Sequence, residues 1–394
     1  MIRGPLVPAF LVILVDLLAY SVILPLLPFY AESFGASPGM VGALLATFAT
    51  CQLLAGPPLG RWSDRIGRKP VLLVSQFGTL AGFILLGVAN SLPIVFAARI
   101  LDGLTAGNIT VAQAYIADVT PPAERTKAFG IVGIAYGVSF LLGPALSGYL
   151  VRFGPTYPIF TAALLSAVSI ATTWLMLPPA RPAADTVAQE HATWRSYLAP
   201  LGHPVTRSRF LQFFASQFLI ALFFAGFALF AERRLPGFGP REVGYTFAYV
   251  GLVGIVFLGA LGPVVSRVGD ASLIAGGFLF AGLSLAVLTA GGRLPLLLVS
   301  MTFFAIGTAV LRPSLTSVIT HHAPAEQQGL VIGLMTSLQS AAQIVAPVIA
   351  GLLIDRGQLN AWAWAGAVVG ALGLLSSARR TAEVTPTQAQ APIA

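Results

Sequence analysis

Long apolar stretches recur along the whole chain and alternate with short polar segments. Each apolar stretch has about 20 residues, the length that an α-helix needs to cross the hydrocarbon core of a bilayer. The polar segments between them are rich in glycine, proline and charged residues. This pattern predicts twelve membrane-spanning helices, over residues 7–30, 39–59, 70–90, 93–117, 128–151, 157–177, 208–231, 242–265, 271–291, 295–320, 328–353 and 359–378.

A longer polar segment separates the sixth apolar stretch from the seventh. It is rich in proline, alanine and charged residues, a composition typical of a linker. We therefore expect four parts: a six-helix bundle over 1–178, a cytoplasmic linker over 179–207, a second six-helix bundle over 208–379 and a disordered tail over 380–394.

The two predicted bundles share sequence patterns at a nearly constant offset. Gly60-x-x-x-Asp64-Arg65-x-Gly67 recurs 202 residues later as Gly262-x-x-x-Ser266-Arg267-x-Gly269. The loop Pro-Ala-Glu at 122–124 recurs at 324–326, and Gly-Pro at 143–144 is answered by Ala-Pro at 346–347. These matches indicate a duplicated six-helix unit. The predicted fold class is an all-α polytopic membrane protein with two pseudo-symmetric six-helix bundles, an architecture typical of alternating-access transporters.

Composition excludes most soluble classes of protein. Only 9% of the residues are charged and the mean hydropathy is +0.85, whereas soluble domains carry about 25% charged residues. A soluble enzyme, a nucleic-acid-binding protein and a disordered protein all fit poorly. The single cysteine, Cys51, excludes an intrachain disulfide and a cysteine zinc site. We expect neither a metal nor a bound cofactor.

The net charge of +8 is best explained by membrane topology. If the N-terminus is cytoplasmic, fourteen of the arginines and lysines fall in cytoplasmic segments and six in segments on the other side. That distribution follows the positive-inside rule. The chain is therefore predicted to cross the membrane with both termini cytoplasmic.

Several motifs resemble those of one transporter family. The loop from Gly60 to Lys69 resembles the signature of the major facilitator superfamily between spans 2 and 3. Gly143-Pro144 with Gly148 resembles the antiporter motif of its drug/proton branch. Asp16, with Leu24-Pro25-Leu-Leu-Pro28, and the stretch from Arg99 to Asp118 are similar to the tetracycline/proton antiporters.

The resemblance implies roles for two groups of residues. In the loop after span 2, Asp64 would cap a helix start in the other half, and Arg68 would pair with Asp118 in the state closed on the cytoplasmic side. Gly143-Pro144 would bend span 5. The implied conformational gating residues are Gly60, Asp64, Arg65, Gly67, Arg68, Asp118, Gly143 and Pro144. Tetracycline exporters also carry an acid in the middle of their second half, whereas here Glu232, Glu242, Asp270, Glu326 and Asp355 lie at span ends or in loops.

Three charged residues lie inside predicted spans of the first half. Such residues are costly in hydrocarbon and mark ion or substrate pathways. The hydrocarbon favours a protonated Asp16, and a carboxyl group that gains and loses a proton suits proton coupling. Arg99 and Asp102 lie three residues apart on one helical face. They form either a static ion pair or an ion pair that breaks when a proton or a substrate molecule arrives. We predict Asp16, Arg99 and Asp102 as proton-coupling residues.

Polar side chains within the spans predict a mostly apolar cavity with a few polar anchors, suited to an amphipathic organic compound. The predicted cavity residues are Gln52, Asn108, Gln113, Tyr136, Gln217, Tyr245, Tyr249, Arg312, Gln339 and Gln343.

The leading hypothesis is a proton-coupled antiporter that exports small lipophilic or amphipathic compounds, acting as a monomer and powered by the proton gradient. The alternative is an organic-anion or nutrient carrier on the same fold, in which Arg99 and Arg312 attract the anion. A receptor that does not transport is a further alternative on this fold. An enzyme is not expected, because the chain has neither a phosphate-binding Gly-Lys loop nor a His-Glu-x-x-His motif.

Overall fold

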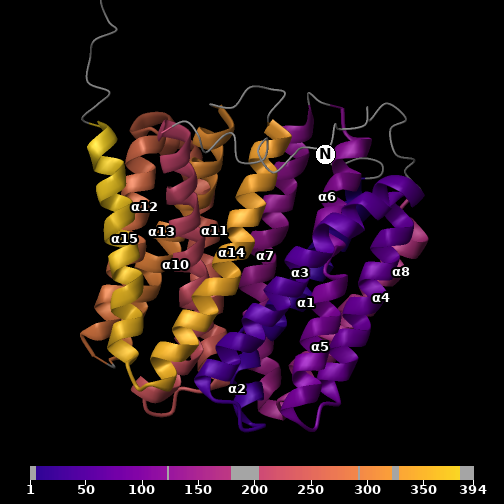
Figure 1. The fold of residues 1–394 in the computed structure, drawn as a ribbon, viewed down its shortest axis with the longest axis horizontal. Helices are drawn as coiled ribbons and strands as arrows, with labels where there is room; N and C mark the ends of the chain where they lie inside the picture. The colour runs from indigo at the N-terminus through magenta and orange to yellow at the C-terminus, as the bar shows by residue number, and fades with distance from the viewer. Residues whose placement is uncertain (1–5, 122–123, 179–203, 292, 322–327, 382–394) are drawn as a thin grey trace, which may run out of the picture. The chain divides into compact units, whose positions relative to one another are not determined.

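The computed structural model describes residues 6–121, 124–178, 204–291, 293–321 and 328–381 (Figure 1). Within these ranges the regular structure is entirely helical. In the first half the helices are α1 (Leu6–Ile23), α2 (Leu27–Glu32), α3 (Pro38–Ile66), α4 (Arg68–Gly87), α5 (Leu92–Thr105), α6 (Asn108–Val119), α7 (Arg125–Leu150), the short 3-10 helix η2 (Val151–Phe153) and α8 (Thr156–Met176). In the second half they are α10 (Pro204–Arg234), α11 (Pro240–Val268), α12 (Asp270–Thr289), α13 (Leu294–His321), α14 (Gln328–Asp355) and α15 (Leu359–Thr381).

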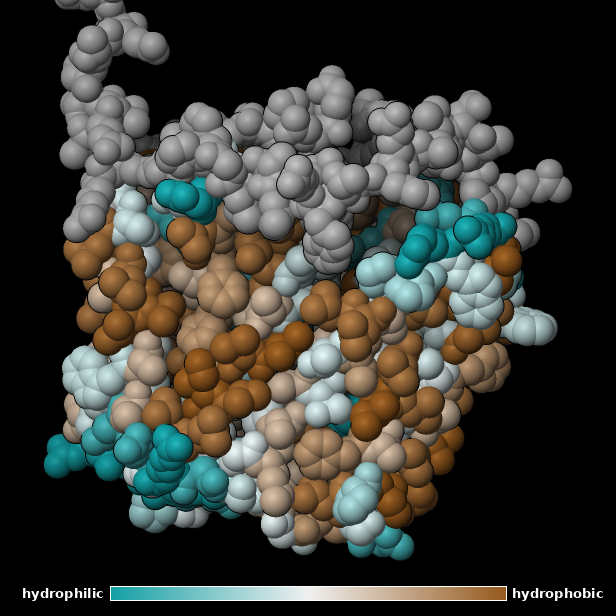
Figure 2. All heavy atoms as spheres, in the orientation of Figure 1, coloured by the Kyte–Doolittle hydropathy of each residue, from teal (hydrophilic) through white to brown (hydrophobic). Residues whose placement is uncertain are grey.

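Twelve helical segments are long and apolar enough to cross a membrane, which confirms the predicted fold class. Ten are single helices that match predicted spans to within several residues at most of their ends, and α7 continues into η2 to form an eleventh. The twelfth, Leu92–Val119, is built from α5 and α6 with a break between them. Large apolar side chains cover much of the visible surface (Figure 2). Leu54, Leu164, Leu175 and Val256 are more than 60% exposed, as expected for helices that face lipid.

The chain forms two compact units. The first comprises helices α1 to α8 together with residues 221–255 and 340–362, and the second includes residues 256–339 and the parts of α10 and α15 that the first lacks. Within the first unit, α1 packs along α6, α7 and α8, and α4 packs along α5 and α8. The helices α1 and α4 therefore share a neighbour in α8. The division of the chain into domains at 178 and 208 stays a prediction, and residues 179–203 and 382–394 lie outside the described ranges.

The turns of the two halves repeat at the same offset as the motifs. Gly67 ends α3 with φ of 101°, and Gly269 separates α11 from α12 with φ of 76°. Gly35 and Gly237 have φ of 81° and 74°, again 202 residues apart. L side chains rarely adopt these backbone conformations, so each turn requires glycine. The conserved spacing of these turns within the chain supports an internal duplication.

Candidate functional site

A buried ion pair lies within the first unit. Arg99 and Asp102 face the same side of α5, and their nearest charged atoms are 2.9 Å apart. Their side chains are only 3% and 5% exposed. The Arg99 guanidinium also faces the rings of Phe48 and Phe83, at 5.4 and 5.8 Å from the ring centroids. Ring faces add favourable electrostatics for a desolvated cation, so this pocket holds both charges away from water.

Glycine on α4 makes room for this pair. A Cβ atom at Gly82 would lie 2.9 Å from the Cβ atom of Asp102 and 3.3 Å from a carbonyl oxygen of α5. Thr79, one turn earlier on α4, interacts with the Asp102 carboxyl group. The face of α4 that contacts α5 thus carries a glycine, Gly82, and a hydroxyl group, that of Thr79. These small groups leave room for a charged side chain at the contact between the two helices.

Asp16 lies deep in the same unit, on α1, and is 8% exposed. Its carboxyl group is near Gln76 on α4 and Ser169 on α8, and it also interacts electrostatically with Asp102. Neither of its oxygens has a hydrogen-bond partner of good geometry. Buried polar atoms without partners are rare, and an ionised carboxylate in this state would be costly. The structure therefore brings Asp16 and the Arg99–Asp102 pair into one buried charged cluster.

The span that carries Arg99 and Asp102 is broken directly after them. The helix α5 ends at Thr105, and α6 begins at Asn108. The Ser75 hydroxyl of α4 accepts from the Gly107 amide at 2.9 Å and donates to the Thr105 carbonyl. Asn108 donates to the Thr79 hydroxyl. Discontinuous helices are typical of transporter binding sites, so the break makes this region a candidate for such a site.

Four residues of this region were not singled out from the sequence. Ser75, Gln76 and Thr79 lie on α4, and Ser169 lies on α8. The mid-span Gln76 is a signal that sequence reasoning can use, because a glutamine is rare in hydrocarbon without a partner. The serines and the threonine carry no such signal, since hydroxyls often bond to their own helix.

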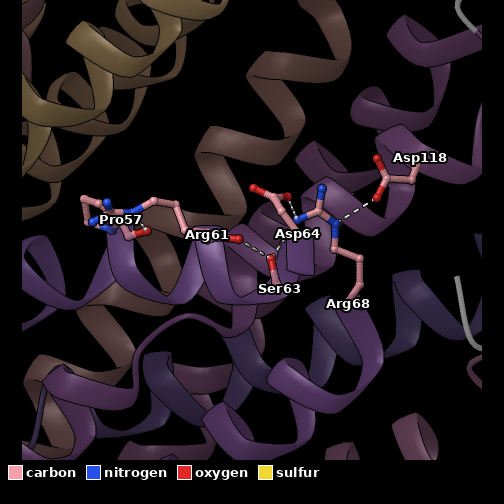
Figure 3. Close-up of polar contacts among 7 residues, drawn as sticks. Pro57, Arg61, Ser63, Asp64, Arg68 and Asp118 are labelled. Carbon is pink, nitrogen blue, oxygen red and sulfur yellow. Dashed lines mark hydrogen bonds and ion pairs between the residues drawn. The ribbon is translucent and has the colours of Figure 1, made fainter. Parts of the chain in front are cut away.

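A second group of charged residues surrounds Arg68 at the start of α4 (Figure 3). The Arg68 guanidinium donates through Nε to Asp118 on α6 at 2.7 Å and through Nη1 to the Ser63 hydroxyl at 2.6 Å. It also pairs with Asp64. The expected pairing of Arg68 with Asp118 is therefore present. The planar guanidinium group of Arg68 therefore links the end of α3, the start of α4 and the end of α6.

The other members of this motif have simpler surroundings. The Lys69 ammonium donates to the Trp174 carbonyl in the last turn of α8 at 2.8 Å, a favourable place for a cation. Arg65 is exposed, and Gly60 accepts from the Ser63 hydroxyl through its carbonyl. Asp64 is mostly exposed apart from its pairing with Arg68. Its expected contact with a helix start in the other half stays a prediction.

The helix α7 carries the Gly143-Pro144 motif. Gly143 contacts Ser21 on α1, whose hydroxyl donates to the Ser139 carbonyl at 2.8 Å. On another face of α7, a Cβ atom at Gly244 of α11 would lie 2.7 Å from the Pro144 carbonyl oxygen. The α7 backbone thus approaches two helices closely within the first unit. The expected bend at Pro144 stays a prediction.

The predicted cavity residues are found in different environments. Asn108 and Gln217 are buried, at 7% and 6% exposure, and Asn108 contributes to the interior of the first unit through Thr79. Tyr245 and Arg312 are exposed. The partly buried ones are Gln52, Gln113, Tyr136, Tyr249, Gln339 and Gln343. In the described ranges no three His, Cys, Asp or Glu side chains gather as a metal site would require.

Comparison with known proteins identifies the family. The model of the family described as Major Facilitator Superfamily matches residues 9–240 and 235–392. The chain belongs to the major facilitator superfamily. This facilitator is 29% identical in sequence to the class D tetracycline resistance protein of Salmonella ordonez over 366 residues, and the alignment covers 91% of each protein. It is also 29% identical to multidrug resistance protein 2 of Bacillus subtilis (strain 168), covering 91% of the chain and 90% of the relative.

Solved structures share the fold of this facilitator. The crystal structure of the human organic anion transporter MFSD10 (TETRAN) aligns over 95% of the chain and 98% of that protein, with a TM-score of 0.72 and 23% sequence identity. The nucleoside transporter NupG aligns over 98% of the chain and 100% of that protein, with a TM-score of 0.75 and 12% identity. The family, the curated relatives and the twelve membrane-length helices together show an integral membrane protein that transports small molecules.

Proposed function

We propose that this facilitator is a proton-coupled antiporter that exports small lipophilic or amphipathic compounds by alternating access. The buried cluster of Asp16, Arg99 and Asp102 carries the proposal. A buried carboxyl group without hydrogen-bond partners must be solvated or paired when it ionises. Coupling proton uptake and release at Asp16 to a change of conformation would supply the energy for export.

The names of the relatives support the class of substrate. Tetracycline resistance proteins and multidrug resistance proteins are similar to this chain over about nine-tenths of their length. Resistance through a transporter implies export. We infer that the chain lies in a bacterial inner membrane with both termini in the cytoplasm, so that the Arg68 cluster is cytoplasmic and the turn after Glu32 faces the other side.

The alternative of an organic-anion carrier is less well supported by the site. It relies on arginines that attract an anion, yet the Arg99 guanidinium pairs with Asp102 at 2.9 Å and is buried. An anion would have to displace that carboxylate in a region closed to water. The pairing is better suited to exchange with a proton than with a bulky anion.

Transport in proteoliposomes tests the proposal. With tetracycline and a lipophilic fluorescent dye as probes, we expect accumulation driven by an imposed pH gradient and abolished by a protonophore. Asp16→Asn should remove the dependence on the gradient, because an amide cannot carry a proton. A matched Glu124→Gln variant, which changes an exposed acid, should keep it. Probe transport that is indifferent to the pH gradient, or gradient-driven accumulation of an organic anion alone, would contradict the proposal.

A further inference from the structure

An arginine lies among exposed aromatic side chains at the turn between α7 and α8. The Arg152 guanidinium of η2 lies over the rings of Tyr149 and Phe153, at 3.7 and 4.6 Å from the ring centroids. The centroids of Phe153 and Tyr157 are 5.9 Å apart, so the rings form a continuous group. Arg152 and all three rings are exposed. Because ring faces attract a cation, they orient the Arg152 side chain while leaving it accessible.

A second arginine lies at the same end of the first unit, on α11. The α7 and α11 backbones meet here, since a Cβ atom at Gly148 would lie 2.8 Å from the Arg241 carbonyl oxygen. Gly148 precedes Arg152 by about one helical turn. The Arg241 guanidinium lies over the Tyr245 ring, 5.8 Å from its centroid, and both side chains are exposed. Two neighbouring helices thus present guanidinium groups that aromatic rings orient.

Neither guanidinium group has an acidic partner in the described part of the chain. Among those residues the side chains of Arg152 and Arg241 form no ion pair and donate no hydrogen bond. Glu242, which follows Arg241, accepts instead from the Gly239 amide at 3.0 Å. A guanidinium group carries five N–H donors in a planar fork that matches carboxylate and phosphate oxygens. Both groups are therefore available to an anion from outside the chain.

The positions of the two arginines along their spans indicate which anion reaches them. Arg152 lies at the end of the span Ala128–Phe153, and Arg241 lies at the start of the span that begins at Pro240. Both ends lie on the same side of the membrane, because two spans separate them. Span ends lie at the level of the lipid headgroups, where tyrosine is enriched. The anionic group at that level is the phosphate of a phospholipid.

An apolar surface suited to acyl chains begins at the same turn. Tyr157, Phe160, Leu164 and Val168 are three or four residues apart on α8 and so share one face of the helix. Their exposed fractions lie between 45% and 65%. Tyr157 joins this face to the aromatic group around Arg152 through its contact with Phe153. A charged site at headgroup level thus continues into an apolar face that enters the hydrocarbon.

We propose that Arg152 and Arg241 bind the headgroup of one anionic phospholipid, whose phosphate contacts the guanidinium groups and whose acyl chains lie along the exposed face of α8. A headgroup with a net negative charge is favoured over a zwitterionic one, because the cationic group of the latter is repelled by the arginines. The bound lipid contacts both halves of the duplicated chain. The inference does not rest on proton-coupled export, since the site is defined by lipid binding alone.

Native mass spectrometry of the purified full-length protein in detergent tests this inference. Phosphatidylglycerol and phosphatidylcholine are added in equal amounts, and the lipids retained on the protein are counted. We expect one phosphatidylglycerol to be retained in preference to phosphatidylcholine. Arg152→Gln and Arg241→Gln should each lower that preference about fivefold, the effect of one arginine near an anionic headgroup. An excess of inorganic phosphate should not displace the lipid, because it has no acyl chains.

Arg356→Gln is the matched control, because it removes an exposed arginine from the turn between two other spans on the same side of the membrane. It should leave the preference for phosphatidylglycerol unchanged. Equal retention of the two lipids by the wild type, or an equal loss in Arg356→Gln, would overturn the site. Displacement by inorganic phosphate would contradict a lipid as the ligand. Two retained lipids, of which each single variant removes one, would contradict a shared headgroup.

Discussion

Arg99 and Asp102 place opposite charges 2.9 Å apart in a part of the first unit closed to water. Removing both charges from water costs several kcal/mol per ion, and the attraction between the two charges offsets only part of this desolvation penalty. A chain that needed only stability would do as well with apolar side chains of similar size. Stability alone therefore does not account for the pair, whereas the proposed role in transport does.

A double variant separates these two explanations. Asp102→Asn alone should lower the free energy of unfolding by about 3–5 kcal/mol, because Arg99 then keeps a buried charge without a counter-ion. Arg99→Met combined with Asp102→Leu should recover most of that stability, as measured by titration with sodium dodecyl sulfate. The same double variant should have lost proton-driven transport. If it transports at the wild-type rate, the pair is a static structural contact.

Helix packing in the first unit depends on backbones that approach each other closely. Gly244 of α11 lies against the Pro144 carbonyl and Gly148 of α7, and Gly42 of α3 lies against the Pro347 carbonyl and Gly351 of α14. The positions correspond at offsets of 202 and 203 residues, so one contact occurs twice in the duplicated chain. Small residues allow such contacts, and smooth surfaces of this kind suit helices that must separate and meet again.

A methyl group at Gly244 tests this contact. In Gly244→Ala the added Cβ atom would lie 2.7–2.8 Å from backbone atoms of Pro144 and Gly148, which cannot rotate away. We expect a loss of about 1–3 kcal/mol in unfolding free energy and slower transport. Gly254→Ala on the same helix is the matched control, since a Cβ atom there meets nothing within 4 Å. Equal stability of the two variants would show that the close contact is not required.

The sequence predicts elements better than it predicts their contacts. The twelve spans can be predicted from hydropathy, because the membrane requires each spanning segment to be apolar and helical regardless of its neighbours. The break between α5 and α6 does not follow from it, because Ser75 of another helix supplies the hydrogen bonds that the broken backbone needs. The charges of Asp16, Arg99 and Asp102 are visible as polar residues in apolar runs. Gln76 is also visible as an amide in an apolar run, whereas Ser169 is recognisable as its partner only once α4 and α8 are brought together.

At the scale of the whole molecule, the proposed alternating-access mechanism requires that the end of the first unit near the two glycine contacts opens. The helices α2 and α10 are linked at this end by Arg233, whose guanidinium donates to Glu32 at 2.6 Å and to Glu232 at 3.3 Å. The side chains are partly exposed, so their pairing contributes no more than about 1 kcal/mol. A contact of that size biases a conformational equilibrium without locking it.

Reversing the charge of Arg233 should therefore open this end. With spin labels on cysteines at positions 33 and 236, in a chain whose single cysteine, Cys51, is replaced by serine, Arg233→Glu should shift the label-to-label distances to longer values. We expect the open-to-closed ratio to rise between about twofold and tenfold, because an attraction is replaced by repulsion. Glu32→Arg in the same chain should restore the short distances. Arg234→Glu changes the neighbouring charge and should leave them unchanged. If both reversals move the distances equally, the net charge of this end, and not the ion pair, sets the equilibrium.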